Sequence, residues 1–181
     1  MITIVDYGMG NLGSLINMLK YIGVKASIQE DPVKISKADK LILPGVGAFD
    51  SAMENINSIP GFKDALDNRV VKEKIPILGI CLGMQLLTDG SQEGKLSGLG
   101  WIPGKATRFP SSKKLKVPHM GWNASRLASP SILTKGVNDN ESRYYFVHSF
   151  YVQVENQKNS LMRSHYGIDF DSAIGHKNIF G

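Results

Sequence analysis

The sequence predicts an α/β protein with a mostly parallel central sheet, flanking helices and a β-rich second half. Two observations support this prediction. Short apolar runs alternate with helical patterns up to about residue 90, and turn residues separate short β-prone runs beyond it. Helices that join parallel strands cover both faces of a sheet, so the alternation favours a parallel arrangement. Because residues 1–181 contain no repeat, low-complexity tract or linker, we expect one domain.

Apolar residues define the elements of the first half. Positions 12, 15, 16, 19 and 22 lie on one face of a helix that ends at Gly23. Strands are predicted at residues 2–6, 25–29, 40–43 and 75–80, and further helices from about residue 49 to Pro60, at 62–74 and at 81–87. The second half contains β-prone runs without a helix of comparable clarity, at 101–102, 106–109, 116–117, 144–152, 160–164 and 171–174.

Composition and charge exclude several classes of protein. The 181 residues are 42% hydrophobic and 20% charged, which is typical of a soluble globular protein. No apolar run approaches the roughly 20 residues that span a bilayer, and the first residues resemble a strand rather than a signal peptide. The net charge of +5 is modest, and its densest basic run, residues 113–116, is too short to predict nucleic-acid binding. One cysteine and scattered histidines predict a cytoplasmic protein without a metal site, and we expect no cofactor.

The motif that carries chemistry is G-x-C-x-G at residues 79–83, between a predicted strand and a predicted helix. Glycines on both sides of Cys81 allow a sharp strand-to-helix turn that points the central side chain outwards. The sulfur then lies at a helix N-terminus, where unpaired N–H groups favour the thiolate, the nucleophilic form. A buried structural cysteine is the alternative. The order of strand, turn and helix favours a nucleophile.

A nucleophile that attacks an amide or ester needs hydrogen-bond donors for the oxyanion that develops. The N–H of Leu82, directly after the cysteine, is one natural donor. The stretch P-G-V-G at residues 44–47 ends a neighbouring strand at the same edge of the sheet. Its glycines allow an amide to turn towards the site, so this loop is a candidate for the second donor.

A second glycine pattern, G-x-G-x-x-G at residues 8–13, follows the first predicted strand. Such a loop binds dinucleotides in some α/β proteins, and Glu30 and Asp31 lie near the expected position of a ribose-binding acid. Residues 91–181, however, resemble neither a second mononucleotide-binding half nor a catalytic region. We therefore do not favour nucleotide binding.

Together these stretches resemble the class I (triad) glutamine amidotransferases. Within that family, "DYGMGNLGS" (6–14) and "VPHMGWN" (117–123) resemble the glutaminase subunits of imidazole glycerol phosphate synthase. The other matching stretches run through the chain in the family's order: "LPGVGAF" (43–49), "GICLGMQLL" (79–87), "GLGWIPG" (98–104) and "YFVHSFY" (145–151). The resemblance implies a flavodoxin-like class I glutamine amidotransferase fold.

The resemblance also implies roles for particular residues. Cys81 is the nucleophile that attacks the side-chain amide of glutamine, releases ammonia and forms a glutamyl thioester. The backbone amides of Val46 and Leu82 hold the oxyanion, with Gly45 and Gly47 shaping the loop. Contacts to glutamine are implied for Gln85, Glu93, Ser149 and Phe150. Contacts to a (β/α)8 cyclase or synthase subunit in a heterodimer, which receives the ammonia, are implied for Asn11, Pro118, His119, Met120 and Trp122.

The family's remaining triad residues form a motif F-H-P-E, which residues 1–181 do not contain. His119 and His148 lie inside other family motifs, and neither His165 nor His176 has an acid two residues later. We expect all four to be partner contacts or surface residues. Either the sequence is truncated, which we favour, or the protein is a glutaminase fold without its base. In both cases residues 1–181 are expected to have little glutaminase activity.

Three functions are consistent with these residues. The favoured one is a glutaminase subunit that supplies ammonia for histidine biosynthesis. A related subunit that supplies ammonia for the modification of cell-surface sugars would use the same residues, and recovery of the partner would distinguish the two. A non-catalytic module that binds the barrel is the third, and the absent motif is its only support.

Overall fold

The first half of the chain forms an α/β unit with helices on both faces of a parallel sheet. The computed structural model describes residues 1–110, 115–138 and 142–181, so part of the basic run 113–116 lies outside it. Parallel neighbours in the order β2-β1-β3-β4 form this part of the sheet: β1 (Ile2–Val5), β2 (Ala26–Gln29), β3 (Lys40–Leu43) and β4 (Ile77–Gly79). The predicted α/β class and parallel arrangement are confirmed.

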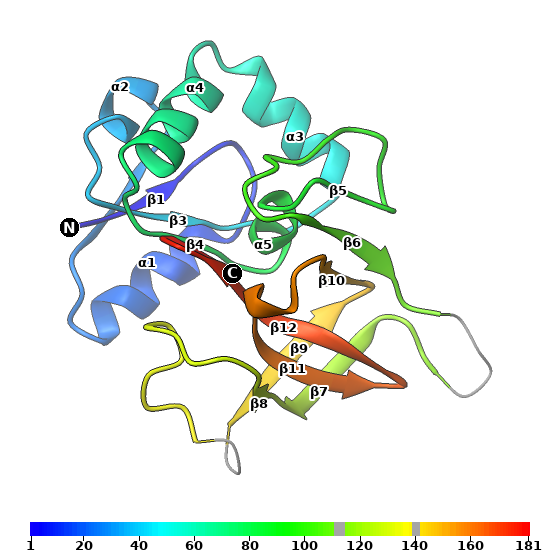
Figure 1. Ribbon diagram of the computed structural model, residues 1–181. Helices are drawn as coiled ribbons and strands as arrows, with labels where there is room; N and C mark the ends of the chain where they lie inside the picture. The colour runs from blue at the N-terminus through cyan, green and yellow to red at the C-terminus, as the bar shows by residue number, and fades with distance from the viewer. Residues whose placement is uncertain (111–114, 139–141) are drawn as a thin grey trace.

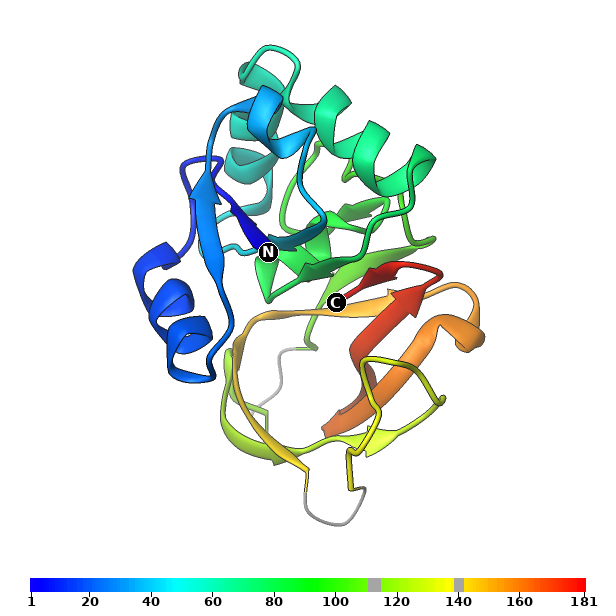
Figure 2. The same cartoon turned by 90° about the vertical axis from the view of Figure 1, so that its left-hand side faces the viewer.

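The helices divide between the two faces of this sheet. They are α1 (Leu12–Tyr21), α2 (Pro32–Ile35), α3 (Phe49–Ser58), α4 (Phe62–Asp67), which continues into a π-helical segment (Asn68–Lys72), and α5 (Leu82–Leu86). Figures 1 and 2 show α1 on one face and α2, α3 and α4 on the other. Each face has its own core. Leu19 of α1 packs with Ile4 and Ile42, whereas the larger cluster joins Phe49 and Leu66 to the opposite face of the strands.

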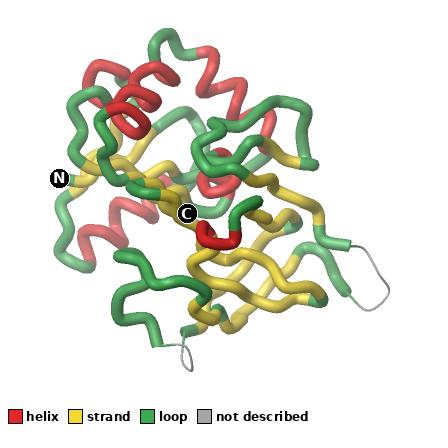
Figure 3. Tube along the Cα trace, in the orientation of Figure 1, coloured by secondary structure: helices red, strands yellow, loops and turns green. Residues whose placement is uncertain are grey.

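In the described residues of the second half, the regular structure is strands and one 3-10 turn (Gln157–Asn159), joined by loops, as Figure 3 shows. Its strands are β5 (Gly90–Ser91), β6 (Gly104–Arg108), β7 (His119–Ala124), β8 (Arg126–Leu127), β9 (Arg143–His148), β10 (Phe150–Val154), β11 (Ser160–Tyr166), β12 (Ile168–His176) and β13 (Ile179–Phe180). β13 pairs parallel with β4 and antiparallel with β12, which carries the sheet on through β10 and β6 to β5. β7 and β9 form a separate antiparallel pair.

The predicted elements of the first half are observed within a few residues of their expected bounds, except that α2, four residues long, was not predicted. The second half differs more. Residues 101–102 are not a strand, because both N–H groups donate to the Leu87 carbonyl in a loop. Residues 116–117 are not a strand either, and the predicted run 144–152 is two strands interrupted at Ser149. β7 was missed because its sequence HMGWNA mixes glycine and polar residues, which are poor strand formers.

Within the described residues, no helix is long and apolar enough to cross a membrane, and no group of three or more His, Cys, Asp or Glu residues is placed to hold a metal ion.

The tightest contact between a helix and the sheet lies at Gly83. A Cβ atom built on Gly83 would lie 1.9 Å from the carbonyl oxygen of Leu43. We therefore expect Gly83→Ala to lower the free energy of unfolding by about 2–3 kcal/mol, because the backbone of α5 or β3 must move. Gly13→Ala in α1 is the control: a Cβ there meets nothing within 4 Å, and the substitution should raise stability by roughly 0.5–1 kcal/mol. Urea-induced unfolding of both variants checks this, and equal effects would contradict it.

Candidate active site

The candidate site lies at the edge of the sheet where the parallel strands end. The chain leaves β1 through Tyr7, β3 through residues 44–47 and β4 through Ile80 and Cys81. Leu43 pairs with Gly79 in the register of β3 and β4, so the segments that follow them start side by side. Ligands of open α/β sheets typically bind beyond the carboxyl ends of the strands. This edge therefore brings together the two motifs that the sequence singled out.

Cys81 occupies the predicted strained turn between β4 and α5. Its φ and ψ angles are 57° and −112°, a left-handed region that costs a non-glycine residue roughly 1–3 kcal/mol. Both flanking glycines are required by space: a Cβ on Gly79 would lie 2.7 Å from the carbonyl oxygen of Gly83, and Gly83 itself contacts β3. Cys81 is exposed. The prediction of an outward-pointing cysteine is confirmed.

The protonation of Cys81 is governed by two opposing effects. Desolvation raises the pKa of the thiol, and a hydrogen bond from the Leu82 N–H lowers it by less. The net pKa lies above the ordinary value for cysteine. The expectation that the helix terminus favours the thiolate at rest is therefore wrong: α5 has only five residues, and desolvation outweighs its amides. A base is needed to remove the proton before attack.

Loop 44–47 packs directly against the first turn of α5. A Cβ on Gly45 would lie 2.8 Å from Leu82 Cβ and 2.9 Å from the Gly83 nitrogen, so only glycine fits there. Val46 is 64% exposed, and Gly47 has a φ of 126°. The structure thus brings Val46 and Leu82, the two predicted oxyanion donors, to neighbouring turns of the chain.

A cavity of about 530 Å³ adjoins Cys81 and is lined by residues of both halves of the chain. Gln85 lies in its wall, is 9% exposed, and its Oε1 atom finds no hydrogen-bond partner among the described residues. A buried carbonyl oxygen without a hydrogen-bond partner is unfavourable by about 1–3 kcal/mol. Phe150 lines the same cavity.

The other two predicted glutamine contacts, Glu93 and Ser149, do not line this cavity. Glu93 accepts a hydrogen bond of 3.0 Å from the Phe49 N–H at the start of α3. Ser149 lies between β9 and β10, where its carbonyl accepts from the Phe109 N–H at 3.1 Å.

His119, which is buried, and His148, which is half-buried, form a hydrogen-bonded pair. His119 Nδ1 lies 2.8 Å from His148 Nε2, and His148 Nδ1 donates to the Phe150 carbonyl at 2.8 Å. Desolvation, with His148 a smaller cause, lowers the pKa of His119 to about 4. The expectation that His119 contacts a partner is wrong here, because the alternation of β7 turns it inwards to 3% exposure. His148, expected at the surface or a partner contact, is held inside by these same bonds.

The alternation of β7 brings the neighbouring predicted interface residues outwards. Met120 and Trp122 are 61% and 65% exposed. The Trp122 ring meets the edge of Tyr145 on β9, at 5.7 Å between ring centroids. Pro118 is also exposed. Asn11, predicted to contact a partner, caps α1 by accepting the Ser14 N–H at 3.1 Å.

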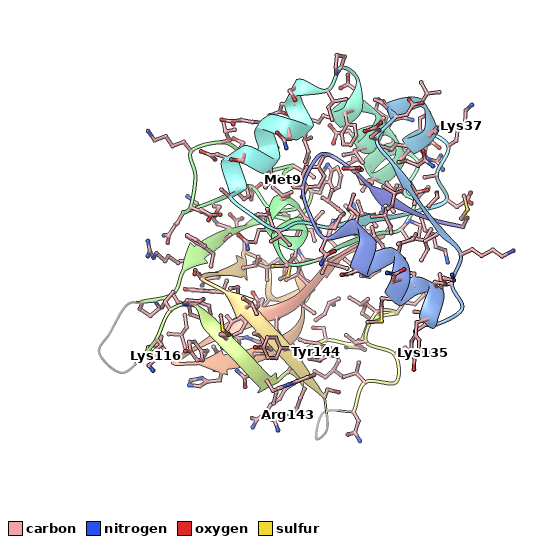
Figure 4. All side chains as sticks on the ribbon, turned by 180° about the vertical axis from the view of Figure 1, so that it is seen from behind. Met9, Lys37, Lys116, Lys135, Arg143 and Tyr144 are labelled. Atoms are coloured by element: carbon pink, nitrogen blue, oxygen red, sulfur yellow. The ribbon has the colours of Figure 1, made fainter. Side chains whose placement is uncertain are left out.

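The glycine loop 8–13 has no free helix terminus for a pyrophosphate, because Asn11 occupies the end of α1. Asp31 likewise caps α2 by accepting the Val33 N–H at 2.8 Å. Two features of the site were not predicted from the sequence. Tyr7 lies beside loop 44–47, and Tyr144 of β9, labelled in Figure 4, lines the cavity. The position of Tyr7 just beyond β1, at the carboxyl edge, was the available signal for it.

Comparison with known proteins identifies the family. The family model described as "Glutamine amidotransferase class-I" matches residues 3–181. The chain is 53% identical, over 181 residues, to the "Imidazole glycerol phosphate synthase subunit HisH 2" of Methanococcus maripaludis, which covers 100% of this chain and 89% of that protein. It is 48% identical to the subunit HisH of Sulfurimonas denitrificans, with 100% and 87% covered, and 42% identical to HisH 2 of Pseudomonas aeruginosa, with 100% and 89% covered.

Solved structures support the fold. A crystal structure of a glutamine amidotransferase superposes with a TM-score of 0.73 at 15% identity, covering 99% of this chain and 87% of that one. The structure of PurLQS from Thermotoga maritima gives 0.72 at 16% identity, with 99% and 84% covered. At these identities the likeness concerns the fold alone. The predicted class I glutamine amidotransferase fold is confirmed.

The raised pKa of Cys81 predicts how its alkylation depends on pH. Because the thiolate is the reactive form, the rate of reaction with iodoacetamide should keep rising from pH 7 to above pH 9 instead of levelling off near neutrality. Cys81 is the only cysteine, so mass spectrometry of the whole protein follows it alone, and Cys81→Ser is the unlabelled control. A rate that is already constant between pH 6 and 8 would contradict the prediction.

Proposed function

This chain belongs to the class I glutamine amidotransferases, as a HisH glutaminase subunit of imidazole glycerol phosphate synthase, and we propose that it hydrolyses glutamine at Cys81. The single observation that carries the proposed site is the strained turn that exposes Cys81 beside a cavity lined by Gln85 and Phe150. The products are glutamate and ammonia.

In the proposed reaction the Cys81 thiolate adds to the side-chain amide carbon of glutamine, and the carbonyl electron pair moves to oxygen. The Val46 and Leu82 N–H groups hydrogen-bond that oxyanion. The tetrahedral intermediate then expels ammonia, which leaves with a proton from a general acid, and a glutamyl thioester remains. Water adds to the thioester through a second oxyanion and releases glutamate and the thiolate.

The Leu82 N–H must change partners in this scheme. At rest it hydrogen-bonds the Cys81 sulfur. Once the sulfur has formed a bond to carbon, its negative charge has moved to the substrate oxygen, so the oxygen is the better acceptor. The same amide thereby stabilises the thiolate before attack and the oxyanion after it.

We propose that the ammonia passes to a (β/α)8 synthase subunit bound over β7 and β9. Exposed apolar side chains alternate along both strands: Met120, Trp122, Tyr145 and Val147. Such a patch on an otherwise charged protein is typical of a subunit interface. Tyr145 and Val147 also line the cavity beside Cys81, which makes this face a direct route from the site to the partner.

Residues 1–181 by themselves are proposed to turn glutamine over slowly, as the sequence suggested. His148 is the histidine that shares the cavity with Cys81. Both of its ring nitrogens are engaged, by His119 and by the Phe150 carbonyl. Burial also lowers the pKa of His148, whereas the pKa of the Cys81 thiol is raised. The imidazole of His148 is therefore a weak acceptor for the thiol proton.

Replacement of Cys81 tests glutamine hydrolysis by this subunit separately from the partner's use of ammonia. With the synthase partner present, Cys81→Ala should lower the glutamate release of residues 1–181 to the background rate without enzyme, because no nucleophile remains. Synthase activity supplied with ammonium salts should stay within about twofold, since the partner is intact. Tyr21→Phe, on the exposed face of α1, is the control. Glutamate release at the original rate would refute Cys81 as the nucleophile.

The slow turnover of residues 1–181 is tested directly. With the partner and its ligand bound, we expect this polypeptide to release glutamate at less than about 1% of the rate of a relative that carries the F-H-P-E motif, because a missing acid–base group typically costs 100- to 10,000-fold. Alkylation of Cys81 should proceed normally in the same sample, which shows that the site is folded. Ordinary turnover would show that residues 1–181 contain a sufficient base.

A further inference from the structure

We propose that Tyr7 is a positioning residue for loop 44–47, whose peptide N–H at Val46 holds the oxyanion. The Tyr7 hydroxyl donates a hydrogen bond of 2.6 Å to the Pro44 carbonyl oxygen, and this bond is buried. The inference rests on the proposed function, because the direction of the Val46 N–H matters only if an oxyanion forms at Cys81.

The phenol is a permanent donor in this position. Tyr7 is 1% exposed, and burial, with Cys81 nearby as a smaller cause, raises the pKa of its hydroxyl far above the ordinary value. Tyr7 therefore stays protonated wherever the protein is folded. Tyr7 itself is not the base, because it keeps its proton.

The hydrogen bond fixes one side of Gly45 while α5 fixes the other. A Cβ on Gly45 would lie 2.7 Å from the Tyr7 hydroxyl oxygen and 2.8 Å from Leu82 Cβ, so the α-carbon is held between these two groups. Because a peptide is planar, holding the Pro44 carbonyl also fixes the Gly45 N–H. Only the bonds that flank the next peptide remain free to rotate. The Val46 nitrogen is thereby set at a defined distance from the turn that holds Cys81.

The residues after Tyr7 close the other side of the loop. A Cβ on Gly47 would lie 2.4 Å from the Cε atom of Met9, and one on Gly10 would lie 3.3 Å from Pro44 Cβ. Met9 is labelled in Figure 4, and its side chain packs against the larger core cluster. Gly8 and Gly10 have φ angles of 83° and 108°, which let the chain bend around loop 44–47. This gives the G-x-G-x-x-G stretch a use other than nucleotide binding.

Tyr7→Phe is the decisive variant, because phenylalanine fills the same space without the donor. The Pro44 carbonyl then loses this partner, and loop 44–47 is free to take other orientations. In the protein bound to its synthase partner, kcat for glutamine hydrolysis should fall roughly tenfold to hundredfold, whereas KM should change less than about twofold. The reason is that loop position affects the oxyanion and not the ground-state contacts of glutamine.

Tyr166→Phe is the matched control. Its hydroxyl also donates to a backbone carbonyl, that of Lys116 at 2.7 Å, but in the β-rich half. Both variants thus lose one phenol-to-carbonyl hydrogen bond, and only Tyr7→Phe should lower kcat. Rates are expressed per active site titrated by alkylation of Cys81, so a partly unfolded variant does not imitate the effect.

A second readout reports the oxyanion directly. The γ-aldehyde of glutamate forms a hemithioacetal with a cysteine: the sulfur bonds to the aldehyde carbon, the C=O π bond breaks, and the thiol proton moves to the former carbonyl oxygen, which lies where the oxyanion forms. The inhibition constant of the aldehyde should be larger for Tyr7→Phe, by the same factor by which kcat/KM falls. The binding of glutamine to the inactive double variant Cys81→Ser with Tyr7→Phe should equal that of Cys81→Ser alone.

The outcomes separate this inference from the proposed function. If Cys81→Ala abolishes glutaminase activity but Tyr7→Phe keeps its kcat and its affinity for the aldehyde, only the role of Tyr7 is refuted. If KM rises while kcat stays constant, Tyr7 acts on substrate binding and the inference is also refuted. If Cys81→Ala keeps its activity, the proposed function has failed. A parallel loss of kcat and aldehyde affinity, with glutamine binding unchanged, supports the inference.

Discussion

The contact between the backbone of α5 and the end of β3 is the constraint on which the site depends. Gly83 lies against the Leu43 carbonyl with no room for a side chain, and Gly45 lies against Leu82 in the same way. The two turns that follow β3 and β4 are therefore held together by backbone packing, which deforms far less than side-chain contacts. Cys81 and the Val46 peptide are brought into register by that packing before any substrate is present.

Two opposing effects act on the pKa of the Cys81 thiol. The turn exposes Cys81, yet its surroundings raise the pKa of the thiol more than the Leu82 amide lowers it. Because the thiolate is the reactive form of cysteine, we expect the Cys81 thiol to need a base before it reacts.

The β-rich half supplies the wall of the cavity opposite Cys81. Its strand β7 has one face buried in the protein and one face exposed. On β7, His119 points inwards and stacks between Phe146 and Tyr166, at 4.8 and 4.0 Å between ring centroids. Met120 and Trp122, its neighbours, point outwards. The buried aromatic cluster fixes the position of the strand, and the exposed side chains are free to contact another subunit. Rigid support of an exposed apolar face is what a subunit interface requires.

The sequence by itself determined the parallel half, the strained turn that exposes Cys81 and the family. The reason is that these depend on local signals, such as the period of apolar residues in α1 and the glycines around Cys81. Only the tertiary structure decided which way β7 faces, since a shift of one residue in a strand exchanges its two faces. It also decided the protonation of Cys81, because desolvation depends on segments far away in the chain. The hydrogen bond of Tyr7 could not be predicted from the sequence for the same reason, because its acceptor, the Pro44 carbonyl, is 37 residues away.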